Sequence, residues 1–165
     1  MLLDVRQMLT PADHQTHRRY AFRVPPDCPG LAIRVAYAPK FLESDESVAR
    51  GTRALDLQAR DLAERVGPAL AAAWTIDQGQ PAPGSRIPNL VTMSLDDADG
   101  VYRGAGHRHA ADQRLFVGHD TASPGLVAGP LPTGEWWLTL SSHTLVTAQC
   151  EVHIQIGAES ASNRP

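Results

Sequence analysis

Apolar and polar side chains alternate in two segments that follow the first twenty residues. Tyr20, Phe22 and Val24 occupy every second position of the first segment, and Leu31 to Tyr37 repeats the pattern after a break rich in proline at 25–30. A period of two is typical of strands with one buried face. The sequence therefore predicts two antiparallel strands, preceded by a polar lead-in.

The second half of the chain returns to the same pattern. Leu90–Leu95 is a short apolar run that ends at a turn over 96–100, Leu115–Val117 is a shorter one, and Trp136–Ser141 and Cys150–Ile156 alternate strictly. Strands with one apolar and one polar face favour antiparallel layers over a parallel α/β sheet. The predicted fold class is mainly β, an antiparallel two-sheet sandwich or jelly roll.

The period changes between residues 47 and 66. Leu55, Ala59, Leu62 and Val66 follow one another at spacings of four, three and four, which indicates one amphipathic helix. Gly67-Pro68 ends it, and residues 69–74 allow a further turn or two. We expect a single domain over residues 1–165, with a helical insertion at about 47–74, a loop over 78–88 and a flexible tail from about residue 158.

Composition narrows the possible partners. The 165 residues carry 15 basic and 18 acidic side chains, a formal charge of −3, so no basic surface for nucleic acid is expected. No stretch approaches the roughly 20 apolar residues of a membrane span. The first eleven residues lack the apolar run of a signal peptide, so the cytoplasm is the expected compartment. Cys28 and Cys150 are too few for a disulfide framework.

Histidines provide the candidate metal ligands. His107 and His109 point the same way from an extended backbone, and His119 and His143 complete the set if the sheets bring them near. Such a site suits zinc or another transition metal. Cupin jelly rolls add a glutamate and a later histidine, but this chain has Gln113 and Trp137 at those positions. No cofactor is therefore the first expectation, with the histidines as polar surface residues, and zinc or another transition metal is the alternative.

Trp137 is the main candidate for ligand binding. If Trp136 joins the core, Trp137 lies on the opposite face of its strand together with His143. A large aromatic side chain there needs a cover, such as the helix over 47–66, or else a ligand or protein partner. Trp137, His143 and Arg103 form the predicted ligand-binding set.

Three runs carry a resemblance to a known family. Asn89–Asp97, Gly100–Gly104 and Ser123–Trp136 together resemble a bacterial β-sandwich domain that precedes metallo-phosphoesterase domains of the PHP type. The similarity spans roughly Tyr20 to Ile156 and extends more loosely to the β-sandwich domains appended to peptidases. It implies an accessory or ligand-binding module, and no catalytic residue is carried over, because the chain has no room for the phosphoesterase barrel.

The leading functional hypothesis is therefore a non-catalytic binding or interaction module, acting beside a separately encoded hydrolase or on a small ligand. A small metal-dependent enzyme that uses the histidines and a carbohydrate-binding or small-molecule-binding sandwich are the alternatives. The Cys150–Ile156 strand has one charged side chain, Glu151, and few guards against edge pairing. If this strand lies at an edge, it predicts a homodimer.

Overall fold

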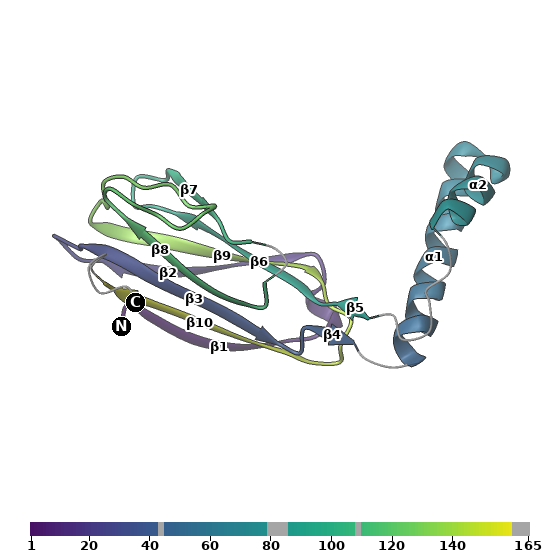
Figure 1. The fold of residues 1–165 in the computed structure, drawn as a ribbon, viewed down its shortest axis with the longest axis horizontal. Coiled ribbons are helices and arrows are strands. Elements are labelled where there is room, and N and C mark those ends of the chain that lie inside the picture. The colour runs from purple at the N-terminus through teal and green to yellow at the C-terminus, as the bar shows by residue number, and fades with distance from the viewer. Residues whose placement is uncertain (43–44, 79–85, 108–109, 160–165) are drawn as a thin grey trace. The chain divides into compact units, whose positions relative to one another are not determined.

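The computed structural model describes residues 1–42, 45–78, 86–107 and 110–159 (Figure 1). Its contacts divide into two compact units. The first is formed by Met1–Lys40 together with Asn89–Pro165, and the second is Phe41–Pro88. The chain thus leaves the first unit after Lys40 and re-enters it at Asn89.

The first unit contains two antiparallel sheets of four strands each, which confirms the predicted sandwich (Figure 1). Sheet A has the order β1 (Leu3–Leu9), β10 (Cys150–Ala158), β3 (Gly30–Ala38), β8 (Asp112–Gly118). Sheet B has the order β2 (Thr16–Val24), β9 (Gly134–Thr144), β6 (Leu90–Asp96), β7 (Tyr102–Ala105).

The strand pairs are nested along the chain. β1 pairs with β10, β2 with β9, β3 with β8, and β6 with β7, so the chain forms one long antiparallel ribbon rolled into two sheets. Pairing of β3 with β10 joins the strands of sheet A, and pairing of β6 with β9 joins the strands of sheet B. Eight strands connected in this way form a jelly roll.

The core lies between the inner faces of the two sheets. Alternate residues of β3 and β10, such as Ile33 and Ile154, are buried against Leu138 and Leu95 from sheet B. Fully burying a side chain of this size stabilises the fold by about 1.5–3 kcal/mol. The alternation seen in the sequence therefore does mark the core-facing positions of these strands.

The prediction of a polar lead-in before the first strand is wrong, because residues 3–9 form the strand β1. Leu3 and Val5 are partly buried and Leu9 is fully buried, while Asp4 and Arg6 between them are exposed. The period of two was present, but Gln7 occupies one inward position and weakens it. A short 3₁₀ turn at Pro11–Asp13 then leads the chain from sheet A to sheet B.

The last strand is central in its sheet. β10 pairs with β1 on one side and with β3 on the other, so it has no free edge. The edge-pairing argument for a homodimer through Cys150–Ile156 therefore does not apply. The segment after β8 covers the edges of β7 and β8, through bonds such as Ala105 N–H to Gly125 O (2.9 Å) and Ser123 N–H to Phe116 O (2.8 Å).

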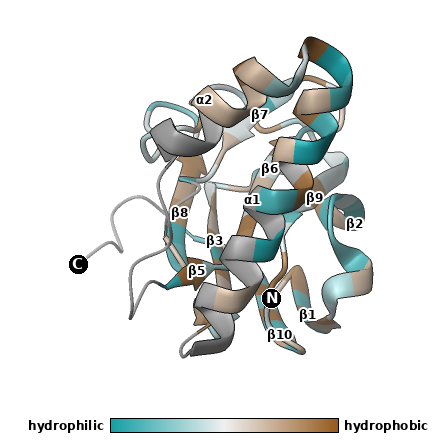
Figure 2. Cartoon of the chain, turned by 90° about the vertical axis from the view of Figure 1, so that its right-hand side faces the viewer, coloured by the Kyte–Doolittle hydropathy of each residue, from teal (hydrophilic) through white to brown (hydrophobic). Residues whose placement is uncertain are grey.

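In its described residues, the inserted unit has two helices where the sequence predicts one. α1 spans Asp45–Val66 and α2 spans Pro68–Gln78, while β4 (Phe41–Leu42) pairs with β5 (Ile87–Pro88). Hydrophilic and hydrophobic residues are interspersed along α1 (Figure 2). Gly67 ends α1 with a φ of 94° and its N–H donates to Ala63 O, and Pro68 starts α2 at the position that proline favours.

No helix within the described ranges has the length and apolar composition needed to cross a membrane. Most of the predicted loop, residues 79–85, lies outside the described residues. The predicted tail begins later than expected, since Ala158 pairs with Leu31 and Glu159 N–H donates to Gly30 O (2.9 Å). Residues 160–165 lie outside the described residues as well.

Candidate binding site

The three candidate metal ligands that the structure describes, His107, His119 and His143, do not form a group that could hold a metal ion. His107 is exposed after β7, the His119 ring lies 2.7 Å from the Asp120 carboxylate at the surface, and His143 lies on the outer face of β9. Among the described residues, no three His, Cys, Asp or Glu side chains form a group that could hold a metal ion. His109 lies outside these residues, so the four-histidine site stays a prediction.

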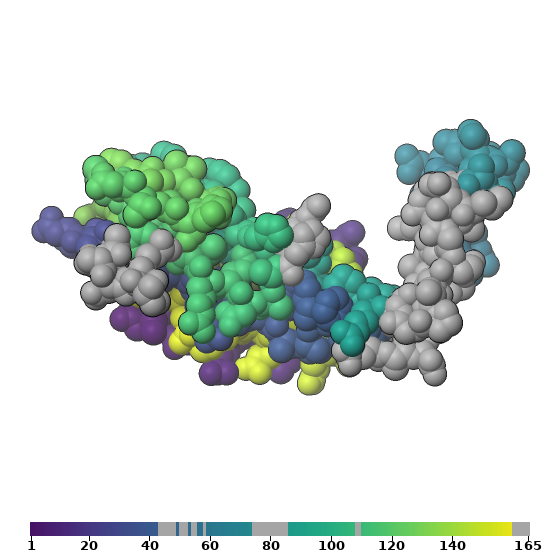
Figure 3. All heavy atoms as spheres, in the orientation of Figure 1, coloured from purple at the N-terminus to yellow at the C-terminus, as the bar shows by residue number. Residues whose placement is uncertain are grey.

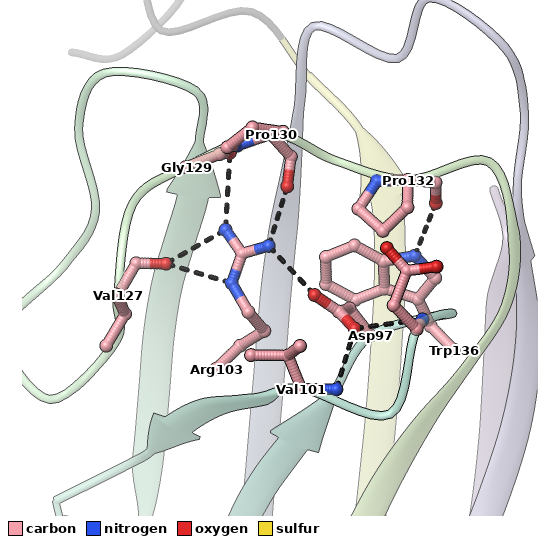
Figure 4. A network of polar contacts seen from close by, with 9 residues as sticks. Asp97, Val101, Arg103, Val127, Gly129, Pro130, Pro132 and Trp136 are labelled. Carbon is pink, nitrogen blue, oxygen red and sulfur yellow. Dashed lines mark hydrogen bonds and ion pairs between the residues drawn. The ribbon is translucent and has the colours of Figure 1, made fainter.

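Arg103 lies inside the sandwich rather than on its surface. The residue is 4 % exposed, and its guanidinium forms an ion pair with Asp97 at 3.3 Å. The remaining donors bond to the carbonyl oxygens of Val127, Gly129 and Pro130 at 2.7–3.2 Å (Figure 4). These bonds use all five N–H groups of the side chain. The geometry assigns Arg103 to holding the chain, with no donor left for a ligand.

The loop that Arg103 holds is the segment of the resemblance that has the most distinctive Pro and Gly spacing. The indole N–H of Trp136 donates to Pro132 O (2.8 Å), and the Arg103 guanidinium lies 5.4 Å from the centre of the same ring (Figure 4). A Cβ at Gly104 would lie 2.1 Å from Gly125 O, so only glycine permits the close approach of β7 to the loop. The loop forms part of the light-green surface in Figure 3. Its pattern therefore encodes a rigid crossing between the sheets.

Trp137 lies on the outer face of sheet B, as predicted, and is partly exposed. The Arg19 guanidinium lies 4.4 Å from the centre of its ring, and Arg19 also approaches the Asp96 carboxylate at 3.9 Å. A stacked guanidinium shields one face of an indole and attracts it electrostatically. One face of the Trp137 indole is thus covered from the neighbouring strand β2, and ligand binding at Trp137 stays a prediction.

The polar residues around Trp137 are paired across strands. The ring of His143 is 2.8 Å from the Thr92 hydroxyl, and the ring of His17 is 2.8 Å from the Ser141 hydroxyl. Ser141 and His143 share a strand face but have different partners. The Ser141–His17 pair lies on an exposed sheet surface, and no carboxylate bonds to the His17 ring within the described residues, so a hydrolytic triad is not formed.

The outer face of sheet A contains a hollow that sequence reasoning missed. It has a volume of about 670 Å³ and is lined by side chains and backbone from β3, β8 and β10, with Met1 and Glu159 at its border. Ala32 and Gly157 are the small residues of its floor, while Arg34, Arg114 and Phe116 rise beside them. Ala32 pairs with Gly157 on one side and with Phe116 on the other. The hollow forms because Ala32 and Gly157 lie side by side on neighbouring strands with almost no side chain, while the residues around them are larger.

A smaller hollow of about 340 Å³ lies on the same sheet and includes Ala36 and Ala38 of β3. Arg34 and Asp112 stand between the two, joined by two bonds of 3.0 and 2.9 Å. These bonds hold the pKa of the Asp112 carboxyl below its usual value and raise that of Arg34. Alanines at outward positions of β3 were visible in the sequence, and they were the available signal for a hollow.

No family model matches the chain, and no curated protein is significantly similar to it. The assignment of a function must therefore rest on the surface of the molecule itself.

Proposed function

We propose that the protein is a non-catalytic binding module that takes a small organic ligand in the hollow on the outer face of sheet A. The observation that carries the proposal is the hollow itself, at about 670 Å³ on a surface built from three adjacent strands. Pockets that bind small molecules typically have 300–1,000 Å³. The size thus fits a ligand of metabolite dimensions.

The residues that line the hollow support ligand binding without catalysis. Within the described residues it has one carboxylate, Glu159, and no histidine, cysteine or hydroxyl side chain. General acid–base catalysis needs a positioned proton donor and acceptor, and covalent catalysis needs an activated nucleophile. Arginine, glutamine, aromatic and small residues provide recognition instead. Because they lie on paired strands, little backbone ordering is needed when a ligand binds, and the entropy cost is mainly that of the side chains.

The resemblance to domains that precede PHP-type phosphoesterases supports an accessory role. We include in the proposal that the module acts beside a separately encoded hydrolase. Copurification from the native host tests this part, and the expected result is a stoichiometric hydrolase in the eluate. Repeated recovery of the chain alone would limit the proposal to ligand binding.

Filling the hollow tests the main proposal. A Cβ at Gly157 would meet no atom within 4 Å, so the site has room for the start of a side chain, and Gly157→Leu is chosen to fill the hollow. Ala21→Leu is the matched control, because Ala21 is exposed on the outer face of sheet B. A fragment library is screened by saturation-transfer NMR against the three proteins.

We expect fragments that bind the wild type and Ala21→Leu but not Gly157→Leu. The proposal is wrong if no fragment binds the wild type, or if Gly157→Leu retains the same binders with the same affinity. Thermal unfolding of each variant confirms that the comparison is made between folded proteins.

A further inference from the structure

The two arginines of the hollow face each other across a strand pair. Arg34 on β3 and Arg114 on β8 are direct register partners, and both point to the outer face of sheet A. Directly opposite side chains in an antiparallel pair have Cβ atoms about 4.5–5.5 Å apart. Like charges on directly opposite residues destabilise a sheet, so a nearby negative charge stabilises this pair.

Among the described residues, a carboxylate bonds to only one of the two arginines, although the charge of Asp112 acts on both. Asp112 bonds to the Nε and Nη2 atoms of Arg34. Arg114 forms no hydrogen bond or ion pair of its own in the described part of the chain, and its side chain is exposed. Glu159 borders the same hollow, yet no ion pair joins it to either arginine within the described residues. The Arg114 guanidinium is therefore near the Asp112 charge but not bonded to it, and in the described part of the chain its N–H donors stay open at the wall of the hollow.

The geometry points to a ligand that carries a carboxylate or phosphate on an apolar body. This inference rests on the proposed function of the hollow. A free guanidinium fork matches the two oxygens of such a group, and Nη1 of Arg34 remains available beside it. The charged end of the ligand lies between Arg114 and Arg34.

The apolar body of the ligand would lie over the neighbouring row of outward residues across the strands. Phe116 follows Arg114 at the next outward position of β8 and pairs with Ala32, which in turn pairs with Gly157. Phe116 is only 2 % exposed, because its ring packs over Gly30, where an added Cβ would lie 2.5 Å from its Cζ atom. The surface that this row leaves open to an apolar body is therefore mainly that of Ala32 and Gly157. Outward rows are about 7 Å apart along a strand. A ligand of matching length separates its charge from its ring by that distance.

Three probes of similar shape test the inference. They are 4-phenylbutyrate, 3-phenylpropyl phosphate and the neutral 4-phenylbutyramide, each titrated into the ¹⁵N-labelled full chain and followed by amide chemical shifts. We expect at least one anion to shift the amides of Ala32, Arg114 and Phe116 and to bind about tenfold or more tightly than the neutral amide. The two anions show which acidic group the site prefers. Added salt should weaken the binding of the anion and leave the binding of the neutral amide unchanged.

Arg114→Gln is the test variant and Arg23→Gln its control, since Arg23 is exposed on the other sheet. We expect Arg114→Gln to remove the preference for the anion and to leave the melting temperature unchanged or higher, because it relieves the repulsion from Arg34. Arg23→Gln should alter neither property.

Two results overturn the inference and are distinguishable. If the neutral amide binds as tightly as the anions, or if Arg114→Gln keeps the preference, the hollow binds apolar bodies without reading charge and the proposed function survives. If no probe shifts these amides at millimolar concentration and the fragment screen also fails, the hollow is not a binding site and both proposals fall.

Discussion

Arg103 and Asp97 form an ion pair inside the sandwich, where each side chain is only 5 % exposed. Asp97 also accepts the backbone N–H groups of Asp99 and Val101 at its other oxygen, at 3.0 and 2.9 Å. The pair thus closes the turn between β6 and β7 and fastens the loop after β8 at the same point. Each charge is satisfied only while the other is present.

Replacing Arg103 by Ala should lower the free energy of unfolding by about 3–5 kcal/mol, because a buried carboxylate then loses its partner and three carbonyl groups lose their donor. Urea unfolding followed by fluorescence measures the loss. Arg23→Gln, an exposed change, should stay within about 0.5 kcal/mol. Equal effects of the two substitutions would show that Arg103 does not hold the loop.

Asp13 should make stability depend on acidity. Its carboxylate accepts the Thr10 backbone N–H at 2.8 Å and pairs with Arg18, and these contacts lower the pKa of Asp13. The folded state then binds fewer protons than the unfolded state below about pH 4, so this stabilisation is present above pH 4 and is lost as the pH falls through the folded pKa.

We therefore expect Asp13→Asn to lower the melting temperature by about 2–4 °C at pH 7, equivalent to about 1 kcal/mol, and by much less at pH 3. Differential scanning calorimetry at the two pH values measures this. Asp120→Asn, at an exposed carboxylate, is the control. A difference that persists unchanged at pH 3 would contradict the linkage.

The insertion should be removable. Asn89 N–H donates to Lys40 O at 2.8 Å, so the two ends of the insertion are already adjacent in the first unit. The fully buried Asn89 side chain also bonds to Pro39 O and Thr147. Replacing residues 41–88 by a two-residue Asn-Gly turn should leave a folded sandwich.

A β-rich circular dichroism spectrum and cooperative unfolding of the shortened chain would confirm this prediction. Asn89→Ala in the same background should cost about 2 kcal/mol or more, because buried polar partners are then left unpaired. A shortened chain that lacks cooperative unfolding would mean that the first unit depends on the second.

The two thiols should differ in reactivity. Burial raises the pKa of Cys150 to about 11, whereas Cys28 is only partly buried. At pH 8 about a thousandth of the Cys150 side chain is thiolate, the form that reacts. Titration with a disulfide reagent should label Cys28 first and Cys150 only on unfolding. In Cys28→Ser the fast phase should disappear, and a fast phase that remains would place a reactive thiol at Cys150.

Removing the stacked guanidinium should expose Trp137. Arg19→Ala leaves one face of the indole uncovered, so acrylamide should quench the tryptophan fluorescence more strongly than in the wild type. The increase should vanish in the double variant Arg19→Ala with Trp137→Phe. If it persists, the added quenching arises at another tryptophan and the cover is not Arg19.

The sequence predicted the strands whose inward positions are all apolar. Leu31 to Tyr37 and Cys150 to Ile156 alternate without an exception, since burial on one face of a sheet imposes a period of two. β1 was missed because Gln7 breaks that period, and α2 was underestimated because Gly67-Pro68 marks both an end and a start. The local pattern therefore predicts an element where a single constraint, such as burial on one face of a sheet, determines the residue types.

Sites were harder to predict, because they depend on pairing between distant residues. Arg103 has the chemistry of a surface ligand-binding residue, but only the arrival of the loop near Pro130 makes it an interior anchor. Likewise, Arg34 and Arg114 are eighty positions apart in the chain, and register alone makes them neighbours. Trp137 was placed on the correct face, while its cover, Arg19, lies on a strand that the pattern could not align with it.

The nested strand order governs when the protein can fold during its synthesis. β1 has a single sheet partner, β10, and more than one hundred residues separate them in the chain. At 5–20 residues per second, the ribosome makes β10 about 7–30 seconds after β1. β3 also pairs with β10, so until β10 has been synthesised the nascent chain lacks the strand that joins β1 to β3 in sheet A. High contact order of this kind slows folding to milliseconds or seconds, and native sheet A forms only after β10 has been synthesised.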